Sequence, residues 1–170
     1  MKWPIKIFVL AVCLSMLFGI FAELILINAG IVISCIILSF LITISVITDM
    51  IGVAATAASI DKFKNKTGKG VGEAIYLVKN ADKVASLVSD VIGDVCGILS
   101  GACGAAIVVK IAIEQPNGAL GVIVASLVSA LIAGITILFK ALGKSYSIKN
   151  ANKIVLVVGK LLSFFVKRVV

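Results

Sequence analysis

The sequence contains no histidine, and only 14% of its 170 residues are charged. Without histidine there is no imidazole base and no pairing of cysteine or serine with histidine for nucleophilic catalysis. An intramembrane aspartyl protease has a glycine before one catalytic aspartate and a tyrosine before the other. At those two positions this chain has Val91 and Thr48 instead. We therefore expect no enzymatic activity.

Apolar residues dominate the chain. They make up 61% of it, against roughly 45–50% in soluble globular domains. A membrane-spanning helix needs about 20 consecutive apolar residues. The sequence therefore predicts an all-α integral membrane protein with four transmembrane helices. The four apolar stretches are Ile5–Ile27, Ile31–Val53, Val84–Ile113 and Ala119–Leu142.

The positive charge is distributed unevenly along the chain. The connections Asn28–Gly30 and Glu114–Gly118 contain no lysine, and the basic residues cluster in the other polar segments. Because cytoplasmic segments are enriched in lysine and arginine, we expect both termini in the cytoplasm of a cell-membrane protein, and no nucleic-acid partner. The clustered basic residues are Lys2, Lys6, Lys62, Lys64, Lys66, Lys69, Lys79, Lys83, Lys144, Lys149, Lys153, Lys160, Lys167 and Arg168.

Two polar segments have helical patterns of their own. In the tail, Lys153, Lys160 and Lys167 recur every seven residues, with apolar residues such as Ile154, Leu161, Leu162, Phe164 and Phe165 between them. Such a pattern is typical of an amphipathic helix on an anionic membrane surface. We expect residues 61–83 and 145–170 to be interfacial segments on the anionic inner leaflet.

The third apolar stretch carries two carboxylates in an unusual setting. Asp90 and Asp94 are four residues apart, so on an α-helix they lie about 6 Å from each other and repel. Steps of three and four residues place Ser86, Asp90, Gly93, Asp94, Gly97, Gly101 and Gly104 on one stripe. We expect the glycines of this stripe to pack against small residues of the fourth stretch, such as Ser129 and Ala133.

Three arrangements would account for the aspartates. A cation is held by Asp90, Asp94, Ser86 and Ser89, or Lys140 pairs with one aspartate, or one carboxyl stays protonated. Counting 1.5 Å per residue along the helices puts Asp49, both aspartates and Lys140 in the cytoplasmic half of the bilayer, where they form one cluster. Lys110 falls near the outer end of its helix, and we expect it to extend outward to the headgroups.

Several short motifs follow one another in a familiar order between about residues 45 and 165. Ala54-Ala55-Thr56-Ala57 is similar to the motif Ser-Ala-Ala-Glu-Thr-Ala of a known transporter family. Ile92-Gly93-Asp94 is similar to the motif Ile-Gly-Asn of the same family. Lys79-Asn80-Ala81-Asp82, Gly143-Lys144-Ser145 and Asn150-Ala151-Asn152 complete the series. In this order they resemble the transmembrane domain of the CorB/CorC/cyclin-M magnesium and cobalt transporters.

The resemblance implies a core of three transmembrane helices, a homodimer, and Mg²⁺ bound within the membrane by serine, asparagine and glutamate. Some positions depart from the family. Val53 stands in place of a serine, Thr56 in place of a glutamate, Asp94 in place of an asparagine, and Lys140 in place of a glutamate ligand. By this comparison residues 1–30 are an added anchor helix, and residues 31–170 are the CorB-like domain.

Two functions remain open at this point. In the first, the chain transports divalent cations, with Asp90, Asp94, Ser86, Ser89 and Asp49 as oxygen ligands and Lys140 as a charge partner. In the second, it is a non-transporting membrane scaffold in which an ion pair between Asp94 and Lys140 replaces the metal.

Overall fold

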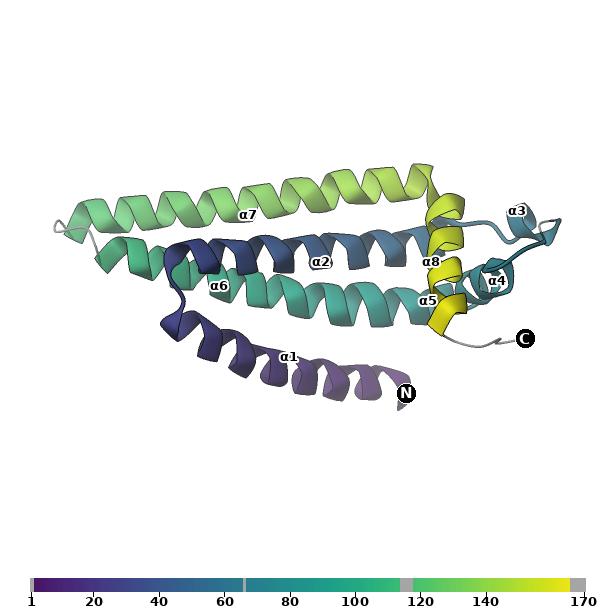
Figure 1. Cartoon of the computed structure of the whole chain (residues 1–170), viewed down its shortest axis with the longest axis horizontal. Coiled ribbons are helices and arrows are strands. Elements are labelled where there is room, and N and C mark those ends of the chain that lie inside the picture. Colours follow the sequence, from purple (N-terminus) through teal and green to yellow (C-terminus); the bar gives the residue numbers. More distant parts are fainter. Residues whose placement is uncertain (1, 66, 114–117, 166–170) are drawn as a thin grey trace. The chain divides into compact units, whose positions relative to one another are not determined.

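The computed structural model describes residues 2–65, 67–113 and 118–165, and every regular element within them is a helix (Figure 1). Four helical stretches are long and apolar enough to cross a membrane, so the predicted all-α, multi-pass membrane fold is confirmed. They are formed by α1 (Lys2–Asn28), α2 (Ile31–Ala57), the run α5 (Ala81–Val84), η1 (Ala85–Gly93) and α6 (Asp94–Ile113), and α7 (Gly118–Lys149).

The remaining helices are short. They are α3 (Asp61–Lys64), α4 (Val71–Lys79) and α8 (Ala151–Phe165). The fourth membrane-length helix runs seven residues past the predicted end at Leu142, to Lys149, and continues through Gly143 without a break. Residues 114–117 of the predicted turn Glu114–Gly118 lie outside the described residues, as do the basic residues Lys66, Lys167 and Arg168, and Gly118 is the first residue of α7.

The chain folds as two compact units. Unit one comprises residues 1–45 and 94–139, and unit two comprises residues 46–93 and 140–170. Both α2 and α7 contribute one part to each unit. Each unit has a core of its own.

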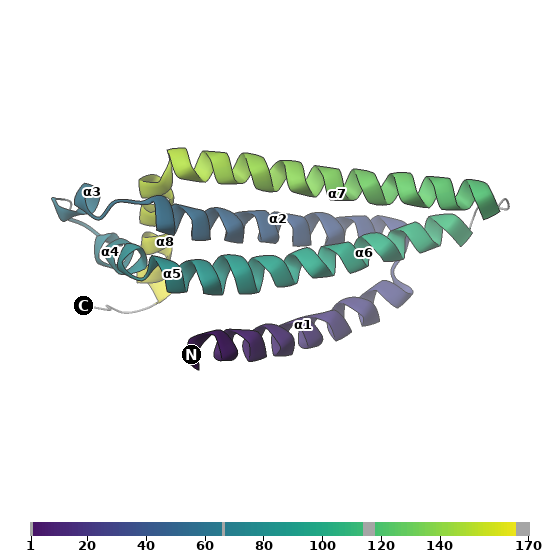
Figure 2. The ribbon, with the colours of Figure 1, turned by 180° about the vertical axis from the view of Figure 1, so that it is seen from behind.

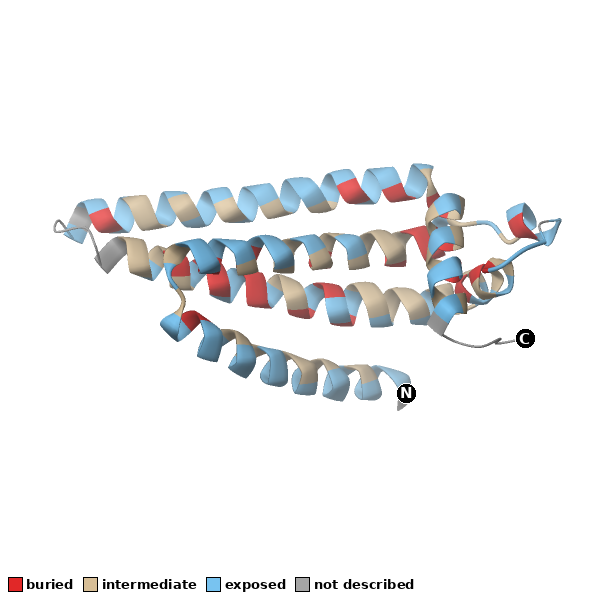
Figure 3. Ribbon diagram, in the orientation of Figure 1, coloured by how far each residue is buried: buried red, intermediate tan, exposed pale blue. Residues whose placement is uncertain are grey.

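In unit one, α1 lies beside α6, as Figures 1 and 2 both show. The core consists of Leu26, Leu38, Cys103 and Ile107. Most other side chains of α1 are exposed, as are those of α7, and they appear in pale blue in Figure 3. These helices are apolar on several sides, which is the pattern of helices surrounded by lipid rather than by protein.

In unit two, α8 packs against α4, and the short helix α3 adds a fully buried Phe63. Figure 1 shows α8 turning away from the end of α7. The sequence predicts that the apolar sides of residues 61–83 and 145–170 face the membrane, but much of both sides is used in this core. Its buried residues are Ala54, Phe63, Ala74, Leu77, Ala151 and Val155. On α8, Leu161 and Phe164 remain exposed, with Lys153 and Lys160.

Candidate functional site

The third membrane-length stretch changes its helix type partway. Residues Ala85–Gly93 form a π-helix, η1, between two α-helical segments. Its hydrogen bonds join residues five apart instead of four, and such segments are frequent at functional sites. The α-helical spacing assumed for the aspartate stripe therefore does not apply here.

The face of η1 that contacts α2 is one position removed from the predicted stripe. It consists of Ala85, Ser89 and Gly93, which contact α2 at Thr48, Asp49 and Gly52. Asp90 and Asp94 are exposed, whereas Gly93 between them is buried. The prediction of a single stripe containing both aspartates and Gly93 is wrong for this reason.

Asp49 is the centre of a polar cluster in unit two. Its Oδ2 atom lies 3.0 Å from the ammonium nitrogen of Lys140, at the unit-two end of α7. Its Oδ1 atom accepts a hydrogen bond of 2.9 Å from the Ser89 hydroxyl. The side chains of Lys140 and Asp49 are 27% and 23% exposed, respectively, so protein does not cover the pair completely.

Two glycines allow the helices to approach this carboxylate. A Cβ atom on Gly93 would lie 2.6 Å from Asp49 Oδ1 and 3.0 Å from Thr48 Oγ1. A Cβ atom on Gly52 would lie 2.7 Å from Ser89 Cβ. A side chain at Gly52 would therefore push Ser89 away, and one at Gly93 would displace the Asp49 carboxylate, so both glycines allow Asp49 and Ser89 to lie within hydrogen-bonding distance.

The cluster lies well inside the membrane-length helices. Asp49 precedes the end of α2 by eight residues and Lys140 precedes the end of α7 by nine, or about 12 and 14 Å along the helix axes. An unpaired charge costs about 3 kcal/mol at the centre of a spanning helix by insertion scales, and less toward its ends, where these two residues lie. The ion pair removes most of that cost by bringing opposite charges together.

The predicted site residues are thus only partly gathered. Asp49, Ser89 and Lys140 meet, and Lys140 forms an ion pair with Asp49, whereas the sequence offered Asp90 or Asp94 as its partner. Ser86 is half-buried, and Asp90 and Asp94 are exposed. Within the described residues, no group of three or more aspartate, glutamate or cysteine side chains is placed to hold a metal ion.

Comparison of the chain with protein-family models, with curated proteins and with solved structures gives no match. The resemblance to CorB-type transporters therefore rests on the sequence motifs. In the structure Lys140 contacts Asp49 of α2, which lies one helical turn before Val53.

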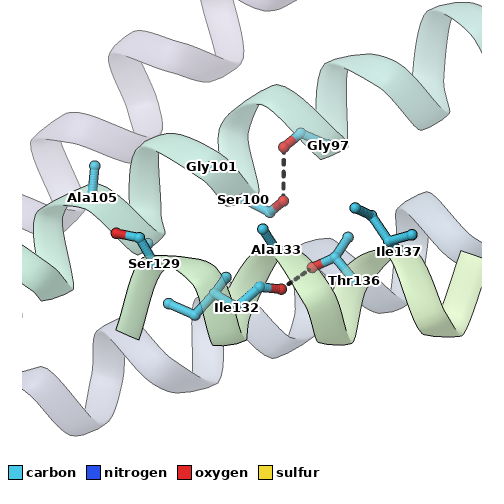
Figure 4. A pocket seen from close by; sticks show the side chains of 10 residues that line it. Gly97, Ser100, Gly101, Ala105, Ser129, Ile132, Ala133, Thr136 and Ile137 are labelled. Atoms are coloured by element: carbon cyan, nitrogen blue, oxygen red, sulfur yellow. Dashed lines mark hydrogen bonds between the residues drawn. The ribbon is translucent and has the colours of Figure 1, made fainter. Parts of the chain in front are cut away.

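In unit one, the small residues of α6 and α7 line a cavity of about 330 Å³ (Figure 4). The prediction that the glycine stripe packs tightly against α7 is wrong at Gly101, where a Cβ atom would meet nothing within 4 Å. The Ser100 and Thr136 hydroxyls donate to carbonyls of their own helices, at Gly97 and Ile132. These two polar groups are therefore already engaged.

Lys110 was expected to extend outward to the headgroups, but it is directed at the turn between α1 and α2. Its ammonium donates to the carbonyl oxygens of Leu26 at 2.9 Å and Ala29 at 2.5 Å, and to the Ser34 hydroxyl at 3.4 Å. The last carbonyls of a helix lack intrahelical partners and carry partial negative charge, so a cation there is favourable. Lys110 thus caps α1 from a different helix.

Proposed function

We propose that this chain is a CorB-like membrane protein that transports divalent cations, Mg²⁺ or Co²⁺, across the cell membrane, and that the cation binds at Asp49. The observation that carries this proposal is a partly accessible carboxylate about 12 Å inside a membrane-length helix, neutralised by a single lysine. Ionisable residues at such depth commonly mark ion pathways.

The donor atoms around Asp49 suit a hydrated hard cation. Two carboxylate oxygens and the Ser89 hydroxyl lie together. Mg²⁺ commonly binds through one or two carboxylates and keeps several of its water ligands. A site with one carboxylate and one hydroxyl therefore agrees with a cation that passes through rather than one that is held permanently.

In this proposal Lys140 is a built-in counter-charge. Its ammonium occupies the Oδ2 side of Asp49 when no cation is bound, and an arriving cation must displace it. The ammonium and the divalent cation exclude each other, because at an effective dielectric of about 20 a single and a double positive charge repel by about 8 kcal/mol at 4 Å. The lysine keeps the empty site neutral and makes binding weak enough to be reversible.

Removal of this competitor provides the test. We expect Lys140→Met to bind Mg²⁺ at least tenfold more tightly than the unmodified protein, because the carboxylate is then free. The measurement is the thermal unfolding temperature of the purified protein against Mg²⁺ concentration. Asp49→Asn should show no Mg²⁺ dependence.

Lys144→Met is the matched control for this titration. Lys144 lies four residues further along α7 and is exposed, so its loss should leave the Mg²⁺ dependence unchanged. If Lys140→Met shows no gain in Mg²⁺ affinity while it remains folded, the displacement mechanism is wrong.

A second candidate is a non-transporting membrane scaffold. The observation that favours it is that both oxygens of Asp49 already have partners, Lys140 and Ser89, with Gly93 packed against them. In that case the ion pair fixes α2 to α7 permanently. Lys140→Met would then lower stability without creating a Mg²⁺ response.

The same proposal includes a homodimer with both termini in the cytoplasm. Support for the orientation comes from the basic residues of unit two, which include exposed Lys144, Lys149, Lys153 and Lys160. Lysines close to an anionic leaflet gain about 1 kcal/mol each from the surface potential. The exposed apolar sides of α1 and α7 are available to lipid and to a second copy.

A further inference from the structure

A second cavity lies in unit one, between α1 and α6. Its volume is about 470 Å³. Small residues form much of its wall, with Gly19 and Ala22 on α1 and Ala102 and Ala106 on α6. The cavity is open on one side and mainly apolar, and it borders helices that are otherwise exposed to lipid.

Only two charged residues line this cavity, Glu23 and Lys110. An ammonium group has three donors, and those of Lys110 reach two backbone carbonyls and one hydroxyl. Among the residues that the structure describes, Glu23 has no ion-pair partner. An apolar cavity thus has an exposed carboxyl group without an ion-pair partner at its edge, about 8 Å along α1 from the helix end at Asn28.

We propose that this cavity binds one phosphatidylethanolamine molecule of the surrounding bilayer. An acyl chain lies along the small residues, and the primary ammonium of the headgroup donates hydrogen bonds to Glu23. Such charge-assisted bonds are about twice as strong as neutral ones. Lys110 has no donor left for the lipid phosphate and acts on it only through its positive charge, so Glu23 and Lys110 together match the charges of a zwitterionic headgroup.

This pairing predicts a choice between two abundant lipids. Phosphatidylcholine has the same phosphate and acyl chains, but its quaternary ammonium has no N–H group to donate to Glu23. The site is separate from the Asp49 cluster, and the proposal does not depend on cation transport. The proposal gives Glu23 a role in lipid recognition. A residue near the end of a transmembrane helix does not need such a role to be tolerated there.

The test is a lipid titration of the purified, delipidated full-length protein, followed by native mass spectrometry. We expect dioleoyl phosphatidylethanolamine to bind at least tenfold more tightly than dioleoyl phosphatidylcholine, a ratio that corresponds to about 1.4 kcal/mol. Glu23→Gln should reduce the ratio to near one. Glu73→Gln, an acid of α4 in unit two, should leave it unchanged.

A third variant tests the cavity itself. Ala102→Leu places a larger side chain in the cavity and should weaken the binding of both lipids, with helicity checked by circular dichroism. Equal binding of the two lipids to the unmodified protein would overturn the proposal. A preference for phosphatidylethanolamine that persists in Glu23→Gln would also overturn it. The same holds if the site binds a protein partner through Glu23 in the absence of lipid.

Discussion

Asp49→Asn is expected to lower the free energy of unfolding by about 3 kcal/mol, since it leaves the Lys140 ammonium without its counter-charge inside the membrane. Breaking a buried ion pair usually costs about 3–5 kcal/mol, and the lower value applies because each side chain is about a quarter exposed. Lys140→Met should cost a similar amount, because it strands the carboxylate. The measurement is chemical unfolding in mixed micelles.

The double variant Asp49→Asn with Lys140→Met separates the ion pair from other effects. It removes both charges, so we expect it to recover most of the lost stability, which for two single losses of about 3 kcal/mol means a coupling free energy of about 5 kcal/mol. Additive losses in the double variant would show that the two side chains do not act as a pair.

A second ion pair in the same unit is a matched control. Asp61 and Lys64 lie 2.7 Å apart, but their side chains are 79% and 65% exposed. Surface pairs contribute only about 0–1 kcal/mol. Asp61→Asn should therefore change stability little, which isolates depth in the membrane as the cause of the large effect at Asp49.

The second large effect is expected at the contact of α4 with α8. A Cβ atom on Gly159 would collide with the carbonyl oxygen of Gly70 and would lie 2.9 Å from the backbone nitrogen of Ala74. Both obstacles are backbone atoms, which cannot move aside as a side chain can. We expect Gly159→Ala to cost about 2–3 kcal/mol and to detach α8 from α4. Hydrogen exchange of the α8 amides would report this detachment.

Gly72→Ala is the control for this prediction. Gly72 lies in α4, two residues from Gly70, but a Cβ atom there would meet nothing within 4 Å. Alanine is also the better helix former, so stability should stay constant or rise by up to about 1 kcal/mol. Equal protection of α8 in both variants would contradict the close contact at Gly159.

The fold could be predicted from the sequence because membrane-length helices are a local property. Length and hydropathy alone locate the stretches that became α1, α2 and α7. Contacts of amphipathic segments are different. The pattern of α8 shows that it has an apolar side, but not that Ala151 and Val155 of that side are covered by α4 instead of lipid.

The site was harder to predict. Sequence counting placed Asp49 and Lys140 at a similar depth, and the structure pairs them. Whether the side of this helix with Ser89 or the side with Asp90 contacts α2 depends on the number of residues per helical turn. Residue types do not show that this segment is π-helical. The small residues at Ala85, Ser89 and Gly93, spaced by four, were the available signal. The cap formed by Lys110 joins residues 81 and 84 positions apart, so no local pattern shows it.

Magnesium flux into proteoliposomes that contain the purified chain tests the central claim most directly, with Asp49→Asn and Asp61→Asn assayed in parallel. The account predicts flux from the unmodified protein and from Asp61→Asn, and none from Asp49→Asn with its helicity intact. Flux that persists without the Asp49 carboxylate, or no flux from the correctly folded unmodified protein, would contradict it.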